Sequence, residues 1–317
     1  MSFHQHLARL LLKIGHKLLR LSRWLSPPAA AEPVNRFLAF FYPGHFYSPI
    51  PDPIFVDENA TFLFRTNVEL LPGIDDNWAG QMDLLRQLLL YPRDYQSVFS
   101  CAEADAAGVR FYSDNTFFKE FDAFIYYGFL RHFRPRQIVE VGSGYTSALA
   151  LDTCEKFCQP FPKFVFVEPF PDRLHRLIKQ RDCANVSILE KPVQQVDRTV
   201  FQTLGAGDFL IIDSSHVSKI GSDVNFLLLD ILPQLASGVI IHIHDVFWPF
   251  EYPKAWLDEG RSWNEAYLLR GMLANSQRYR ILFFNSQVAA RRPELLEQLP
   301  AWAKPGQAQS IWLEVIA

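Results

Sequence analysis

The feature that most constrains the fold is a regular alternation of short apolar runs and helical patterns after residue 135. The runs are mostly apolar and rich in β-branched residues, as strands are when helices cover both faces of a parallel sheet. The expected strands are 137–141, 164–167, 186–189, 209–212 and 239–243, with helices near 145–158, 171–181, 196–204 and 222–235.

Two further strands, 279–284 and 311–315, close the chain with no long helix expected between them. Such an ending favours an antiparallel hairpin on the edge of the sheet. We therefore predict an α/β domain over residues 135–317. It has a seven-stranded, mostly parallel sheet, helices on both faces and an antiparallel C-terminal hairpin.

The residues before this domain have a different character. Residues 26–33 hold clustered prolines, which favour an extended linker. From there to residue 134 the sequence is aromatic and irregular, with helical patterns at 78–91 and from about Asn115 onward. We expect residues 26–134 to form a helical cap that contributes to the substrate region.

Residues 1–25 carry five basic residues and no acidic residue. Apolar residues recur between them at helical spacing, which predicts a basic amphipathic helix too interrupted by charge to span a bilayer. The helix could lie on an anionic membrane surface, pack on the protein's own body, or pack on a second subunit in a homo-oligomer.

Composition excludes some classes of function. With 31 basic and 34 acidic residues, the net charge of -3 gives no reason to expect a nucleic-acid partner. The four cysteines are scattered and lack zinc-site or disulfide-framework spacing. With no cleavable signal, they indicate a cytoplasmic protein, peripheral at the inner membrane face if the first helix binds lipid.

The first predicted strand runs into a glycine-containing turn, Glu140-Val-Gly-Ser-Gly-Tyr-Thr-Ser147. Glycines let the backbone approach a ligand, and the following helix offers unpaired N–H groups. The third glycine of a dinucleotide fingerprint is replaced by Ser147, and Glu140 suits a positively charged ligand better than a pyrophosphate. Both details favour S-adenosylmethionine.

Acidic residues and histidines end the other strands. Glu168 closes the second strand, where a carboxylate accepts both ribose hydroxyls of a nucleoside, a feature shared with NAD-binding proteins. Ligands of open parallel sheets bind beyond the carboxyl ends of the strands, so these residues share one rim. The expected cofactor residues are Glu140, Gly142, Ser143, Gly144, Tyr145, Thr146, Ser147, Glu168 and Asp213.

With these motifs, residues 110–317 resemble the class I S-adenosylmethionine-dependent methyltransferases. Within that family the chain is similar to a bacterial branch that carries three motifs in order. The first is Ile-Asp-Ser-Ser-His, which is Ile212–His216 in this chain, and the second is His-Ile-His-Asp, which is His242–Asp245. The third is a Trp-Asn-Glu-x-Tyr-Leu-Leu helix, which is Trp263–Leu269. The resemblance implies a Rossmann-like seven-stranded fold, S-adenosylmethionine as cofactor and methyl transfer as reaction.

Transfer to a hydroxyl requires alignment of two reactants and removal of a proton. His244, at the open end of the fifth strand, is the first candidate base, and His216 is the second. Asp245 could orient a histidine, bind substrate or act as base itself, whereas His242 is expected in the core. We expect O-methylation of a small molecule.

A divalent cation is an alternative. Some O-methyltransferases of this fold hold one with acids after the fourth and fifth strands, where Asp213, His244 and Asp245 fall. A histidine departs from the all-oxygen set that Mg²⁺ or Ca²⁺ prefers, so the sequence favours a mechanism without metal.

Two other functions would suit a fold of this kind, and the sequence disfavours both. A nicotinamide-dependent oxidoreductase conflicts with Ser147 and Glu140 in the turn. A catalytically inactive cofactor-binding scaffold has no need of His216, His244 and Asp245 together.

Overall fold

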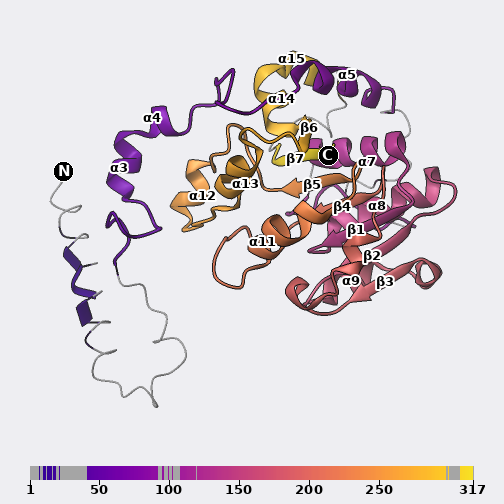
Figure 1. Cartoon of the computed structure of the whole chain (residues 1–317), viewed down its shortest axis with the longest axis horizontal. Helices are drawn as coiled ribbons and strands as arrows, with labels where there is room; N and C mark the ends of the chain where they lie inside the picture. Colours follow the sequence, from indigo (N-terminus) through magenta and orange to yellow (C-terminus); the bar gives the residue numbers. More distant parts are fainter. Residues whose placement is uncertain are drawn as a thin grey trace. The chain divides into compact units, whose positions relative to one another are not determined.

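The structure is a computed structural model of the chain, shown in Figure 1. It describes residues 41–91, 108–118, 120–297 and 308–316, together with residues 7, 10, 11, 13–15, 17, 18, 21, 95, 99, 102 and 299. The chain divides into two compact units, residues 1–64 and 65–317. Within the described part, no helix is long and apolar enough to cross a membrane.

The second unit is built on a seven-stranded sheet with strand order β3-β2-β1-β4-β5-β7-β6. Neighbours among β1 to β5 run parallel, and β7 is antiparallel to both β5 and β6. This confirms the predicted fold class, and every expected strand lies within one residue of an observed one. The strands are β1 Gln137–Val141, β2 Lys163–Val167, β3 Val186–Leu189, β4 Phe209–Ile212, β5 Ile240–His244, β6 Tyr279–Phe284 and β7 Ser310–Val315.

Helices cover both faces of this sheet. The first unit holds α3 Pro53–Glu58 and α4 Ala60–Leu63. The α-helices of the second unit are α5 Trp78–Leu88, α7 Glu120–Phe133, α8 Tyr145–Phe157, α9 Asp172–Leu177, α10 Thr199–Gln202, α11 Asp223–Asn225, α12 Lys254–Asp258, α13 Glu265–Leu273, α14 Asn285–Arg291 and α15 Pro293–Leu296. A π-helix, Phe226–Ile231, and a 3-10 turn, Leu232–Gln234, continue α11.

Several helices differ from the sequence prediction. The helix expected at 171–181 ends at Leu177, because the Asp182 carboxylate accepts the Lys179 N–H at 2.7 Å and starts a separate 3-10 turn. Two short helices, α14 and α15, lie between β6 and β7, and the described residues there hold no long helix, as expected. The two strands pair antiparallel, as predicted.

The contacts divide the chain at residues 64 and 65, whereas the sequence suggested a boundary between 134 and 135. The difference lies in α7, whose apolar side chains from Phe121 to Leu130 are completely buried; Phe129, for example, stacks on Trp312 of β7 at 4.0 Å between ring centroids. This helix therefore forms one core with the sheet (Figure 1). The amphipathic helix predicted for residues 1–25 lies mostly outside the described residues, and the linker at 26–33 lies wholly outside them.

Candidate active site

The turn after β1 requires glycine. Gly142 has a φ of +79°, and a Cβ atom there would lie 2.0 Å from the carbonyl oxygen of Asp213. No side chain fits such a gap, so glycine is the residue that lets the ends of β1 and β4 meet. The Gly142 N–H also donates to the Val167 carbonyl at 3.1 Å, which joins the end of β2 to the turn.

Glu140 lies behind this turn and is completely buried. Its Oε1 accepts hydrogen bonds from the hydroxyls of Thr146 and Ser147, the latter at 2.8 Å. Burial raises the pKa of Glu140 to about 8, although both hydroxyls favour the carboxylate. The Ser147 hydroxyl in turn accepts the Gly144 N–H at 3.0 Å. Glu140, Thr146 and Ser147 thus fix the shape of the turn.

A pocket of about 450 Å³ lies beyond the carboxyl ends of the parallel strands. Three of the predicted cofactor residues, Gly142, Glu168 and Asp213, line it. The two carboxylate oxygens of Glu168 accept the backbone N–H groups of Ser143 at 2.9 Å and Phe170 at 2.8 Å. The carboxylate is thereby held at the pocket edge, with further lone pairs available to a ligand.

Sequence reasoning missed much of the pocket wall. The rule that ligands bind beyond the carboxyl ends applies to β3 as well, and could have identified the residues that follow it. The additional lining residues are Val141, Val167, Pro169, Phe170, Pro192, Val193, Gln194, Ser214, Ser215, Lys219, Gly221, Ser222 and Asp223.

The ends of β4 and β5 bring all the predicted catalytic residues together in a cluster with Asp213. Oδ1 of Asp213 lies 3.4 Å from Nε2 of His216 and 3.6 Å from Nδ1 of His244. The Asp245 carboxylate lies 3.4 Å from the same two nitrogens. His216, His244 and Asp245 are buried, and Asp213 is half-buried at the pocket.

Two cluster residues have strained backbones. His216 has a φ of +58° and Asp245 a φ of +57°, in the left-handed region that side chains other than glycine seldom adopt. Such conformations cost about 1–3 kcal/mol each and concentrate at functional sites. With this backbone, Nε2 of His216 lies 3.4 Å from a carboxylate oxygen of both Asp213 and Asp245.

Glu265 of α13 is a cluster member that lies outside the predicted set. Its completely buried carboxylate lies 2.9 Å from Nδ1 of His216 and accepts the Ser214 hydroxyl at 2.9 Å. The His216 carbonyl accepts the Asn264 and Glu265 N–H groups at 3.0 and 3.2 Å. The start of α13 therefore fixes the orientation of the His216 ring, with Nε2 facing the two aspartates.

The cluster holds its protons on the histidines. Burial opposes a charged imidazole, but hydrogen bonds to Asp213 and Glu265 raise the pKa of His216 to about 10. Burial likewise opposes charge on His244, yet Asp245 and Asp213 raise its pKa to about 9. Burial works against the Asp213 carboxylate too, but the two histidines keep its pKa below the ordinary value.

Comparison with known proteins gives a family match for this domain. Residues 139–246 match a family model described as a methyltransferase domain. An uncharacterized protein of Archaeoglobus fulgidus is 36% identical over 180 residues, which cover 55% of this chain and 78% of that protein. Residues 139–246 of this chain therefore form a methyltransferase domain.

Two solved methyltransferases have a similar fold. The methyltransferase PaMTH1 of Podospora anserina, bound to S-adenosylhomocysteine, is 13% identical with a TM-score of 0.40, covering 84% of this chain and 97% of that one. The O-methyltransferase TomG of Streptomyces achromogenes, bound to S-adenosylmethionine, is 12% identical with a TM-score of 0.41, covering 83% and 96%.

Asp122 of α7 is part of a hydrogen-bond network that contacts the cluster at His244. This buried carboxylate accepts hydrogen bonds from the Ser310 hydroxyl at 2.8 Å, the Gln309 N–H at 3.0 Å and the Asn285 amide. Burial raises the pKa of Asp122 to about 6. The side-chain amide of Gln309 lies 3.5 Å from Nε2 of His244, so this network helps to hold the His244 ring in place.

His242 lies on the same sheet face as His244 but deeper in the core, as predicted. Its ring is 4.5 Å from that of Trp312 and 6.0 Å from that of Tyr126. Neither ring nitrogen has a hydrogen-bond partner among the described residues, and burial lowers the pKa of His242. A neutral, buried His242 is a packing residue of the methyltransferase core.

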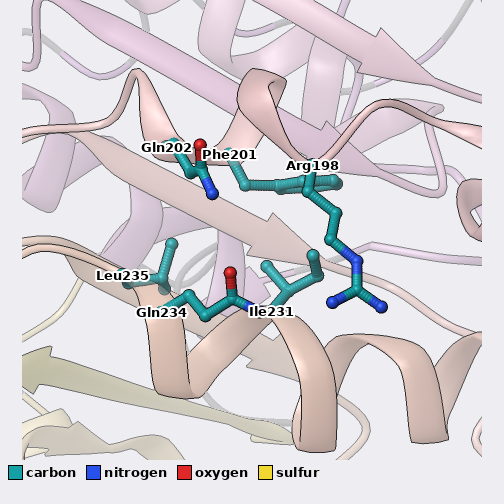
Figure 2. Close-up of a pocket in the computed structure, with 6 residues that line it drawn as sticks. All are labelled: Arg198, Phe201, Gln202, Ile231, Gln234 and Leu235. Carbon is teal, nitrogen blue, oxygen red and sulfur yellow. The ribbon is translucent and has the colours of Figure 1, made fainter.

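Figure 2 shows a second depression, between α10 and the helical segment that follows α11. It encloses no volume that a water molecule could fill, and none of its lining residues belongs to the cluster. It is a surface groove rather than a ligand site of the methyltransferase.

Proposed function

We propose that this methyltransferase transfers the methyl group of S-adenosylmethionine to a hydroxyl group of a small molecule. The observation that carries the proposal is the cluster of two histidines and two aspartates at the edge of a 450 Å³ pocket. A hydroxyl must lose its proton as it attacks the methyl carbon, and a group of facing acids and bases supplies that step.

In this proposal the cofactor occupies the pocket. Glu168 accepts the ribose hydroxyls with the lone pairs that its backbone hydrogen bonds leave available. Gly142, which lines the pocket, would present its backbone to the methionine portion, and Glu140 would contribute by holding the turn in shape. S-adenosylmethionine bound there would supply an electrophilic methyl group beside Asp213, with the cluster behind it.

The acceptor proton passes to the Asp245 carboxylate, because His244 already carries its own proton. The His244 ring lies 3.4 Å from that carboxylate, and its charge favours the anionic form of Asp245 that accepts a proton. His216, held by Glu265, supplies positive charge beside Asp213 and stabilises the carboxylates during the transfer.

The test uses S-adenosylmethionine with a deuterated methyl group and a mixture of small phenols, alcohols, amines and thiols, with products identified by mass spectrometry. Labelled methyl ethers are expected. Asp245→Asn and His244→Gln are expected to lower the rate by about 10²–10⁴-fold while S-adenosylhomocysteine still binds. Labelled methylamines or thioethers in place of ethers, or full activity in both variants, would refute the proposal.

A divalent cation is a second candidate feature, favoured by the cluster geometry. Asp213, His216 and Asp245 each offer a ligand atom, and these atoms lie within 4.8 Å of one another. Glu265 holds Nδ1 of His216 and leaves Nε2 facing the aspartates, an arrangement typical of metal-binding histidines. The mixed nitrogen and oxygen set suits Mn²⁺ or Zn²⁺ better than Mg²⁺, and a bound cation lowers the pKa of an acceptor hydroxyl.

Titration of the protein with Mn²⁺, followed by its electron paramagnetic resonance signal, tests this feature. Binding that His216→Ala and Asp213→Asn both abolish supports the site. Absence of binding, together with activity that survives a chelator, excludes it.

A further inference from the structure

The first unit carries an exposed apolar stripe on a helix. Of the apolar residues at helical spacing between positions 7 and 21, six are described, and all six are helical (Figure 1). Their side chains are 42–61% exposed, so the described part of the chain does not cover them. They are Leu7, Leu10, Leu11, Ile14, Leu18 and Leu21.

These six side chains form a single face. An α-helix turns about 100° per residue, which places them all within an arc of about 100°. From Leu7 to Leu21 the stripe is about 21 Å long, at a rise of about 1.5 Å per residue. A stripe of this kind, left exposed by the described residues, indicates an interaction surface rather than a solvated helix.

Charge decides between the surfaces that could cover this face. Residues 1–25 hold five basic residues and no acidic one. On the same helical count, Lys17 lies about 20° from the edge of the stripe and Lys13 about 60° from it. A second copy of the helix packed on the stripe would bring these lysines toward their counterparts, and like charges beside a helix interface repel.

An anionic lipid surface, by contrast, attracts the lysines beside the stripe. Lysines that flank an apolar stripe extend to the headgroups while the stripe enters the acyl boundary. Two more large apolar side chains of the same unit, Phe46 and Tyr47, are 81% and 66% exposed and suit the membrane interface. Five basic residues interrupt this stretch too often for it to span a bilayer, so the contact is one of lying on the surface.

We propose that the helix containing Leu7 to Leu21 binds the surface of anionic membranes, with its apolar stripe in the lipid and its lysines at the headgroups. The inference does not depend on the reaction proposed above. It attaches the methyltransferase to a lipid surface through a unit separate from the catalytic one.

The test is cosedimentation of the full chain with two kinds of vesicle, phosphatidylglycerol mixed with phosphatidylcholine, and phosphatidylcholine alone. The chain is expected to bind the anionic vesicles at least about tenfold more tightly, and high salt should weaken this binding. The variant L11S/L18S is expected to lose about tenfold or more of the vesicle affinity, since both leucines lie on the stripe.

The matched control is L90S/L229S, which makes the same change at two leucines that are 77% and 51% exposed elsewhere in the chain. This variant should bind vesicles like the unaltered chain, and both variants should keep their affinity for S-adenosylhomocysteine. The proposal fails if the unaltered chain ignores anionic vesicles, or if L11S/L18S and the control bind equally. It also fails if the chain is a dimer that L11S/L18S dissociates, which would assign the stripe to a second copy.

Discussion

The residues of the site fall into two groups: those that directly follow a strand of the sheet, and those that lie on helices packed against the ends of the strands. Asp213, His244 and Asp245 were predictable, because each ends a parallel strand and parallel strands end at one edge. Asp122 was not, because it lies on a helix whose approach to the rim is set by tertiary packing. Glu265 lies in the Trp263–Leu269 motif, but the sequence left it open whether it is a site residue or a surface charge. No spacing in the sequence links Glu265 to His216.

Gly142 carries the sharpest prediction at this scale. Gly142→Ala should destabilise the fold by about 3 kcal/mol or more, since the new Cβ would collide with the Asp213 carbonyl. Gly207→Ala is the matched control, because Gly207 also has a positive φ, +82°, but has open space around it. It should cost about 1 kcal/mol. Equal losses in urea unfolding would contradict the steric account.

The buried Glu140 should make stability depend on pH. Its pKa rises from 4.5 to about 8 on folding, so the folded state binds the proton more tightly. The associated stability is complete below pH 4.5 and is lost as the pH rises through 8, with a slope of up to about 1.4 kcal/mol per pH unit. Glu140→Gln should flatten this slope in urea unfolding at pH 5, 6.5 and 8. An unchanged slope would show that another group is responsible.

At the scale of elements, strands were predicted far better than helices. A strand in a parallel sheet is buried on both faces, so its apolar run marks its ends in the sequence. The helix ends depend on partners distant in the chain. Asp182, which interrupts the helix after Leu177, also binds Arg110, from the loop before α7.

Arg110 should hold three elements together. Its guanidinium lies 2.5 Å from both Asp152 of α8 and Asp182, and all three side chains are buried. Arg110→Met should cost about 3–5 kcal/mol in chemical denaturation, because it leaves two buried carboxylates unpaired. Arg280→Met, which breaks a half-exposed pair with Glu314, should cost less than about 1 kcal/mol. Similar costs for the two variants would argue against this role.

For the whole molecule, the sequence predicted the architecture but not the division of the chain. Near residue 135 an irregular, aromatic sequence gives way to alternating strand and helix patterns, and this change suggested a domain boundary there. In the structure α7 is part of the core of the sheet, and the division falls after residue 64. An apolar helix gives no signal in the sequence of which unit it completes.

Truncation tests this division. Residues 65–317 alone should fold and bind S-adenosylhomocysteine within about twofold of the full chain, since the pocket and the cluster lie entirely within them. Residues 135–317 should fail to fold, because they lack α7 and expose the face that it covers. If residues 135–317 alone fold and bind S-adenosylhomocysteine, the domain boundary lies at residue 135 instead.

Calorimetric titration of the cofactor-free protein with S-adenosylmethionine, S-adenosylhomocysteine and NAD in parallel tests the central claim most directly. The pocket beside Glu168 and the turn at Gly142 should bind the first two ligands and leave NAD unbound. Glu168→Gln should weaken both interactions by about tenfold, since it replaces a charged acceptor of the ribose hydroxyls. Binding of NAD without S-adenosylmethionine, or no binding of any of the three, would contradict the account.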